Sequence, residues 1–189
     1  MNVILTKGSN FMNQQLPSEA HGIVIEEKGA KLKTGALKIP FLQDNDLLIK
    51  VHAAPINHSD LNELQGKHSL EKKFPNIPGG EGSGTVFLAK GAEAQKYMGK
   101  KVVFRVKPDS LIGTYADFSI ANANSVAMLN DDTDLNQAAL QVSEILNNNT
   151  HAIQAQNIQQ FLYQDIEKAI KEYEKNSEQK KILIVSKIK

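Results

Sequence analysis

Cysteine and tryptophan are both absent from the 189 residues of this chain. Without cysteine there are no disulfides, no thiolate zinc sites and no cysteine nucleophiles, which is typical of a reducing compartment. No apolar run approaches the roughly 20 residues of a membrane-spanning helix, so no transmembrane segment is expected. Basic and acidic residues balance, 22 against 21, and no basic run is interleaved with aromatics. Nucleic acid is therefore not an expected partner.

Glycine is missing from the last 76 residues, since all 12 glycines lie between Gly8 and Gly113. No G-x-G-x-x-G can be written anywhere in the chain. A dinucleotide-binding domain needs such a Gly-rich turn, because only glycine lets backbone amides approach a pyrophosphate closely. The sequence therefore predicts that no Rossmann domain is present.

Residues 1 to about 130 alternate short apolar runs with turn residues, which predicts a barrel or sandwich of short strands. Residues 59–64 read as one short helix with Ser59 as its N-cap. At 41% hydrophobic residues the chain can build a core of mainly aliphatic side chains. The predicted strands are residues 23–25, 46–52, 84–88, 101–106 and 115–120.

From Asp132 onward the pattern is helical. Apolar residues from Leu135 to Leu146 recur at three- and four-residue spacing, which predicts one helix capped by Thr133 or Asp134. The Gln-rich residues 154–160 are expected to form a loop or a frayed helix.

The last part of the chain predicts a helix followed by a strand. Residues 166–173 have one apolar face, and Asp165 is the expected cap. The apolar run 182–185 is typical of a strand buried on both faces, which must join the sheet built upstream.

Five segments, in this order, resemble the zinc-independent quinone and enoyl reductases of the medium-chain dehydrogenase/reductase superfamily. Together they cover roughly residues 20 to 150. They are APINHSDL at 54–61, PNIPGGEGSGTV at 75–86, GKKVVF at 99–104, GTYADF at 113–118 and QAALQV at 137–142.

The resemblance implies an α+β fold, in which a GroES-like, partly open β-barrel carries a few peripheral helices. The C-terminal helix and strand also resemble that family's ending, which returns to the catalytic domain. The implied organisation has four parts. They are an N-terminal extension (1–20), the GroES-like domain (21–146), a bridging loop in place of the nucleotide-binding domain (147–160), and the C-terminal helix and strand (161–189).

The resemblance also implies a site without zinc. In zinc-dependent relatives the position of Asn57 is a cysteine ligand and that of Gly80 is a histidine ligand, and only Glu81 is kept. No two of the five histidines stand at i, i+4. We therefore expect no metal.

In the quinone and enoyl reductases Asn57, Ser59 and Asp60 would line the pocket beside the nicotinamide. Two interpretations stay open, since Asn57 and Asp60 can equally hydrogen-bond a turn and cap a helix. His68 stands where enoyl reductases often have a tyrosine proton donor, and imidazole can donate near neutral pH. The alternative for His68 is a solvent-exposed loop residue.

The glycine-rich residues 79–84 do not form a phosphate loop, because they precede the strand at Thr85 and no Gly-Lys-Ser/Thr follows. A tight turn with closely approaching backbones is the expected structure. Likewise Lys180 and Lys181 replace the Gly-Lys pair that usually precedes the family's last strand.

The leading functional hypothesis is a non-catalytic accessory subunit of a larger, mitochondrial respiratory complex, without cofactor. It would lie in mitochondria, peripheral to a membrane complex, with the cytoplasm as the alternative location. Expected partners are other protein subunits, one candidate being a full-length reductase paralogue, and the family's ordinary homodimer is not expected. The alternative is an NADPH-dependent quinone or enoyl reductase half whose cofactor domain is on another chain, with Asn57, Asp60 and His68 as catalytic residues. A small-molecule binding module is the third hypothesis.

Overall fold

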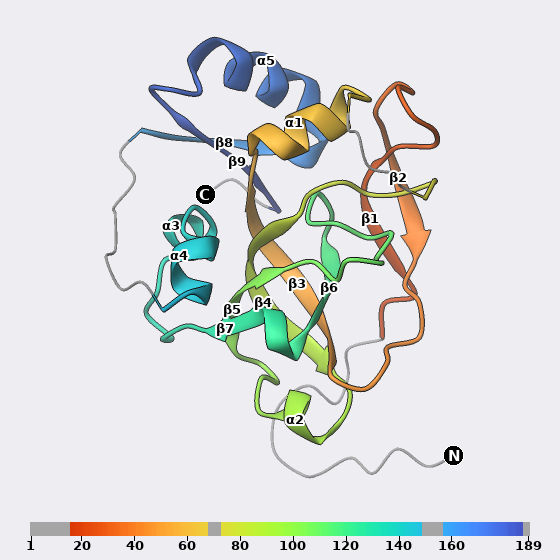
Figure 1. Ribbon diagram of the computed structural model, residues 1–189, viewed down its shortest axis with the longest axis vertical. Helices are drawn as coiled ribbons and strands as arrows, with labels where there is room; N and C mark the ends of the chain where they lie inside the picture. The colour runs from red at the N-terminus through yellow and green to blue at the C-terminus, as the bar shows by residue number, and fades with distance from the viewer. Residues whose placement is uncertain (1–15, 68–72, 149–156, 187–189) are drawn as a thin grey trace.

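The structure is a computed structural model that describes residues 16–67, 73–148 and 157–186. In these ranges the main sheet has strand order β7-β5-β4-β3-β9-β8, with β6 beside β3, and β1 and β2 form a separate pair (Figure 1). The strands are β1 (Glu19–Val24), β2 (Lys33–Lys38), β3 (Asp46–Pro55), β4 (Glu81–Ala89), β5 (Lys101–Arg105), β6 (Phe118–Asn122), β7 (Val126–Met128), β8 (Ile158–Leu162) and β9 (Lys181–Val185).

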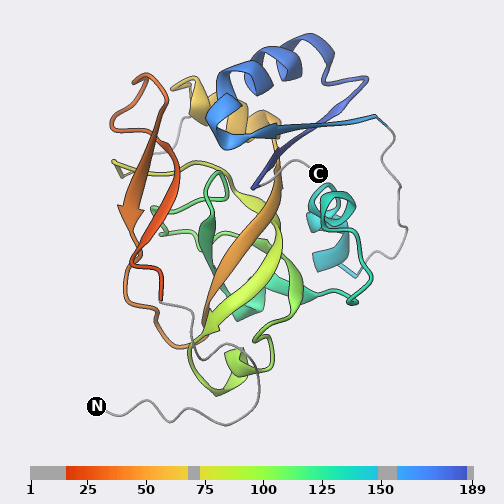
Figure 2. The same cartoon turned by 180° about the vertical axis from the view of Figure 1, so that it is seen from behind.

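Short helices lie around the sheet. They are α1 (His58–Leu64), α2 (Ala92–Gln95), α3 (Leu135–Ala139), α4 (Val142–Leu146) and α5 (Ile166–Asn176), with 3-10 turns at Ala123–Ser125 and Tyr163–Asp165. Both α1 and α5 lie at the same end of the sheet, whereas α3 and α4 pack beside β3, β4 and β5 (Figures 1 and 2).

Strand β3 is the centre of the fold, and its burial explains its length. Apart from Lys50 and His52, every side chain from Asp46 to Pro55 is buried. One edge of β3 pairs with β4, while the other pairs first with β6 and then with β9. In the described ranges the path of paired strands runs from β7 to β8 without closing on itself, which agrees with the expected partly open barrel within an α+β fold.

Glycines bring β4 close to β3. A side chain on Gly84 would place its Cβ 2.3 Å from the Lys50 carbonyl oxygen, and one on Gly82 would come within 2.7 Å of the Ala53 oxygen. The predicted close approach of backbones is confirmed. The strand itself begins at Glu81, so the expectation that these glycines all precede the strand was wrong.

Two boundaries upstream differ from the sequence prediction. Helix α1 begins at His58 with Asn57 as its N-cap, so Ser59 lies inside the first turn. Strand β6 begins at Phe118 rather than at Tyr115, because the backbone of Tyr115 bonds instead to Ile23 and Pro78.

The predicted helix after Asp134 is divided into α3 and α4. Asp134 is the N-cap, as expected, and its side chain accepts from the backbone N–H groups of Asn136 and Gln137. A turn at Leu140 and Gln141 interrupts the helix, which lets Ala138, Ala139 and Val142 all be buried against the sheet.

The C-terminal unit β8-α5-β9 completes the main sheet. Strand β9 lies between β3 and β8, and its residues Ile182–Val185 are at most 3% exposed, which confirms the buried strand. Helix α5 begins after Asp165, also as expected. The expected loop or frayed helix at 154–160 was wrong at its end, because Ile158 already starts β8, whose hydrogen bonds to β9 outweigh its polar composition.

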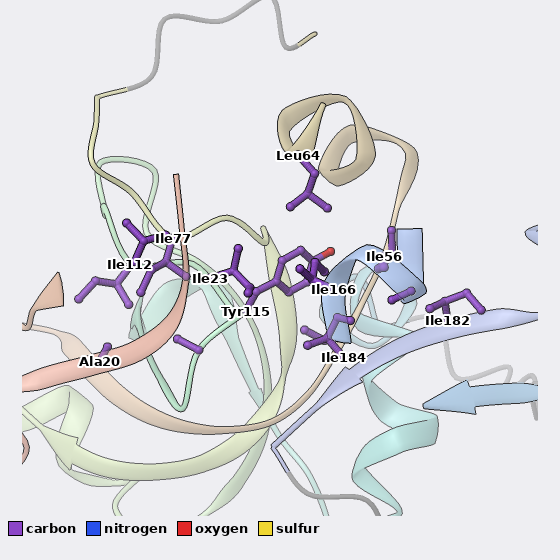
Figure 3. Packing of buried hydrophobic residues seen from close by; sticks show 14 residues of the cluster. Ala20, Ile23, Ile56, Leu64, Ile77, Ile112, Tyr115, Ile166, Ile182 and Ile184 are labelled. Atoms are coloured by element: carbon purple, nitrogen blue, oxygen red, sulfur yellow. The ribbon is translucent and has the colours of Figure 1, made fainter. Parts of the chain in front are cut away.

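The largest hydrophobic cluster joins the two ends of the described chain. Tyr115 lies near its centre, with Ala20 and Ile23 of β1 on one side and Ile182 and Ile184 of β9 on the other (Figure 3). The C-terminal unit is therefore part of the core of the GroES-like domain.

Candidate functional site

Asp60 ties the beginning of α1 to the segment before β4. One carboxylate oxygen accepts the backbone N–H of Asn57 at 2.9 Å, and the other accepts the backbone N–H of Gly80 at 3.2 Å. The side chain is only 5% exposed. This is the helix-capping arrangement that the sequence left open as one interpretation of Asp60, and it uses both carboxylate oxygens.

Asn57 begins a chain of polar contacts that runs from α1 to α4. Its side-chain amide donates to Glu81 Oε1 at 2.9 Å, and Glu81 Oε2 lies 3.9 Å from Arg105 Nε. The Arg105 guanidinium also donates to the Ser143 hydroxyl at 2.8 Å. The structure thus brings together Asn57, Asp60 and Glu81, three of the positions that the resemblance selects.

Burial raises the pKa of the Asp60 carboxyl from 3.8 to about 6. Hydrogen bonds from the backbone of Asn57 and Gly80 act in the opposite direction, while the nearby negative charges of Glu63 and Glu81 add to the increase. A carboxyl with such a pKa is partly protonated just below neutral pH. Its titration therefore affects the stability of the fold.

The pH dependence of stability tests this arrangement. Between about pH 4 and pH 6 the folded protein keeps an Asp60 proton that the unfolded chain has released, so the free energy of unfolding falls as the pH rises through this window. Relative to Asp60→Asn, the free energy of unfolding of the wild type should fall by up to about 3 kcal/mol as the pH rises. This follows from the increase of the Asp60 pKa from 3.8 to about 6, since one pKa unit is worth 1.36 kcal/mol. Urea unfolding of both proteins from pH 4 to 8 measures this difference. A difference that stays constant across the window would contradict the raised pKa.

Tyr115 lies in the hydrophobic core close to Asp60. It is fully buried, and its hydroxyl donates to the Pro55 carbonyl oxygen at 3.0 Å. Burial, followed by the charge of Asp60, raises its pKa well above the usual value. The sequence prediction treated this residue as part of a strand.

Helix α5 reaches the same region from the C-terminal unit. Gln65 at the end of α1 donates to Glu174 of α5 at 2.5 Å. The pKa of Tyr173 on α5 is raised, first by partial burial and then by the charge of Asp60. The C-terminal unit therefore lies next to Asn57, Asp60 and Glu81, which we call the Asn57 cluster.

His68 lies outside the described residues, so its candidate role as a proton donor stays a prediction. In the described part of the chain no three His, Asp or Glu side chains are grouped so that they could hold a metal ion. At Gly80, the position of a zinc-binding histidine in metal-dependent relatives, an added Cβ would meet only Asp60 Oδ1, at 3.8 Å. Space for a side chain exists there, but the residue that would bind zinc is not present.

The hydrogen bonds of this site connect the beginning of α1 with β4, and the segment at Tyr115 with the end of β3. Asp60 accepts backbone donors, Asn57 donates to Glu81, and Tyr115 donates to Pro55. In the described ranges, the buried side-chain atoms without a partner belong to Asn76, Thr114 and Asn136, and none to the Asn57 cluster.

Comparison with known proteins agrees with the fold. Residues 43–131 match the family of the alcohol dehydrogenase GroES-like domain. Quinone oxidoreductase from Sus scrofa is 35% identical over 101 residues, which are 53% of this chain and 30% of that protein. The mitochondrial enoyl-[acyl-carrier-protein] reductase of Xenopus tropicalis is 32% identical over 123 residues, 64% of this chain and 34% of that protein.

The structure of the quinone oxidoreductase from Coxiella burnetii shares the fold, with a TM-score of 0.57 and 24% identity. The match covers 76% of this chain and 49% of that one. The matched class is therefore a GroES-like domain. The chain is similar to quinone and enoyl reductases of the medium-chain dehydrogenase/reductase superfamily, and its matches span about a third of the length of those two sequence relatives.

Proposed function

We propose that this chain is a non-catalytic accessory subunit of a larger protein assembly, derived from a quinone or enoyl reductase. The observation that carries the proposal is the short connection between α4 and β8. Helix α4 ends at Leu146 and packs on β4, β5 and β7, and β8, a strand of the same sheet, begins at Ile158. A nucleotide-binding domain of the usual size, on the order of 100 residues, has no room in residues 147–157.

The polar contacts of the Asn57 cluster support the same proposal. A catalytic group must reach the substrate, whereas both Asp60 oxygens already accept backbone N–H groups. The amide of Asn57 is likewise engaged with Glu81. These residues serve the fold, and the subunit supplies a surface rather than a reaction.

The location is part of the proposal. The related enoyl reductases of Xenopus tropicalis and Mus musculus are named as mitochondrial proteins. We place this subunit in mitochondria, on a respiratory complex and peripheral to the membrane. Of the helices within the described ranges, none combines the length and the apolar composition that membrane crossing requires.

Native mass tests the accessory role. The chain alone is 20.8 kDa. We expect the endogenous protein to migrate in a native gel with a particle of several hundred kilodaltons, which mass spectrometry of the band identifies. Migration as a free monomer contradicts the proposal.

One observation favours a second candidate, a reductase half completed by the nucleotide-binding domain of another chain. The pKa of Asp60, raised to about 6, lies in the range useful for general acid–base chemistry. This candidate requires a one-to-one complex with a nucleotide-binding chain. Co-migration with only one such chain would support it against the accessory role.

A further inference from the structure

An open apolar groove is lined in part by Leu48, near the beginning of β3, whereas the Asn57 cluster lies beyond the end of that strand. We call it the Phe41 groove. It is lined by residues 16–19, 38–42, 48 and 88–90, and its volume is about 770 Å³. None of these residues belongs to the candidate site.

The floor of the Phe41 groove is part of the folded core. Leu42 and Leu48 are 8% and 2% exposed and pack with Ile120. Behind them the rings of Phe87 and Phe118 meet edge to face, with their centroids 5.3 Å apart. The groove is therefore preformed, because its floor cannot collapse without disturbing this cluster.

Two apolar side chains stand out at the rim. Phe41 is 95% exposed and Leu16 is 64% exposed. The segment that carries Phe41 is held by hydrogen bonds from the backbone N–H of Ile39 to Ser18 O, at 2.9 Å, and from Lys90 Nζ to Leu42 O, at 2.8 Å. An aromatic ring held out in water beside an apolar groove is typical of an interaction surface.

The charge beside the groove favours an acidic partner. Lys38 and Lys90 both line it, and in the part of the chain that the structure describes neither forms an ion pair. Glu19 is the acidic residue of the lining. Two ammonium groups against one carboxylate leave a net positive charge at an apolar surface.

The position of Phe41 distinguishes a protein partner from a small molecule. A small ligand is usually enclosed, with 70–90% of its surface buried in the pocket. Phe41 lines the groove yet is 95% exposed, so a ligand confined to the groove would leave most of its ring in water. A protein segment can fill the groove and cover Phe41 at the same time.

We propose that the Phe41 groove is the surface by which this subunit docks on its assembly, and that it binds an apolar segment of another protein flanked by Asp or Glu. The inference rests on the proposed accessory function and adds the docking site and the chemistry of the partner. Phe41 and Leu16 contact the apolar side chains of that segment, while Lys38 and Lys90 pair with its acidic groups.

The test compares Phe41→Asp with Met128→Asp in cells that lack the native chain. Met128 is a matched control, because it is 51% exposed but lies on β7, away from the groove. Native gels should show at least a tenfold loss of particle-bound chain for Phe41→Asp and Lys38→Glu, and none for Met128→Asp. Thermal unfolding of the purified variants should match the wild type, since exposed substitutions usually change stability by less than about 0.5 kcal/mol.

A photo-crosslinker, p-benzoylphenylalanine at position 41, identifies the contact in the intact particle. We expect a cross-linked peptide from another subunit with apolar residues beside Asp or Glu. Cross-linking to lipid, to residues 1–15 of this chain, or to nothing would overturn the docking inference. So would a Phe41→Asp chain that stays in the particle, although the accessory role would then stand. A wild-type chain that never enters a particle contradicts the accessory role itself.

Discussion

Leu183→Ala should lower the free energy of unfolding by about 3 kcal/mol, within the 2–5 kcal/mol range of buried leucine truncations. Leu183 is fully buried in β9, the strand between β3 and β8. Its side chain packs in a cluster with Ala53 of β3 and Ala139 of α3. Neighbouring elements cannot close the space that the truncation leaves, because both flanking strands are fixed by backbone hydrogen bonds. Urea unfolding, followed by circular dichroism, measures the change.

The matched control is Lys181→Ala on the same strand, where the side chain is exposed. Its expected effect is within about 0.5 kcal/mol. A Leu183→Ala change as small as that of the control would mean that the C-terminal strand does not contribute to the core. The conclusion that the C-terminal unit is part of the core of the GroES-like domain would then be wrong.

The purified chain should show no saturable binding of NADPH up to millimolar concentration. Quinone and enoyl reductases of this family hold the pyrophosphate and ribose on a nucleotide-binding domain, for which residues 147–157 leave no room. Without those contacts nothing positions the nicotinamide, and orientation of reacting groups alone can be worth about 7–11 kcal/mol. Isothermal titration calorimetry with NADPH measures the affinity directly.

Quinone oxidoreductase from Sus scrofa, a relative of this chain, is the positive control for the same titration. Micromolar binding of NADPH by the isolated chain would contradict the accessory role, because it would require a nucleotide site built from the GroES-like domain alone. It would also move the second candidate, the reductase half, to first place.

Local patterns predicted much of the fold. The uninterrupted apolar run 182–185 identified a strand buried on both faces, and Asp134 marked a helix start, because both signals depend on neighbours in sequence. The glycines at 79–84 predicted closely approaching backbones, and the structure shows this approach between β4 and β3, where a Cβ at Gly84 would overlap the Lys50 carbonyl. The grouping of Asn57 and Glu81 came from the family resemblance, and their hydrogen bond joins residues 24 positions apart.

Features that depend on distant partners could not be predicted. The beginning of β8 belongs to a Gln-rich stretch that predicts a loop, and all five residues of the strand are only half-buried. Its conformation is decided by its parallel pairing with β9. The inward position of Tyr115 depends on Pro55, 60 residues earlier. The Phe41 groove forms from four separate parts of the chain, so no sequence window contains its pattern.

Rescue of assembly tests the central claim most directly, the claim that this chain acts through its surface and not through a reaction. The measurement is the amount of the particle on native gels after the native chain is removed and replaced by Asn57→Ala, Asp60→Asn or Phe41→Asp. Asn57→Ala and Asp60→Asn chains that fold should restore the particle to the wild-type amount, whereas Phe41→Asp should not. If folded Asn57→Ala and Asp60→Asn chains fail while Phe41→Asp succeeds, the residues of the candidate site are the functional ones, and the accessory role is wrong.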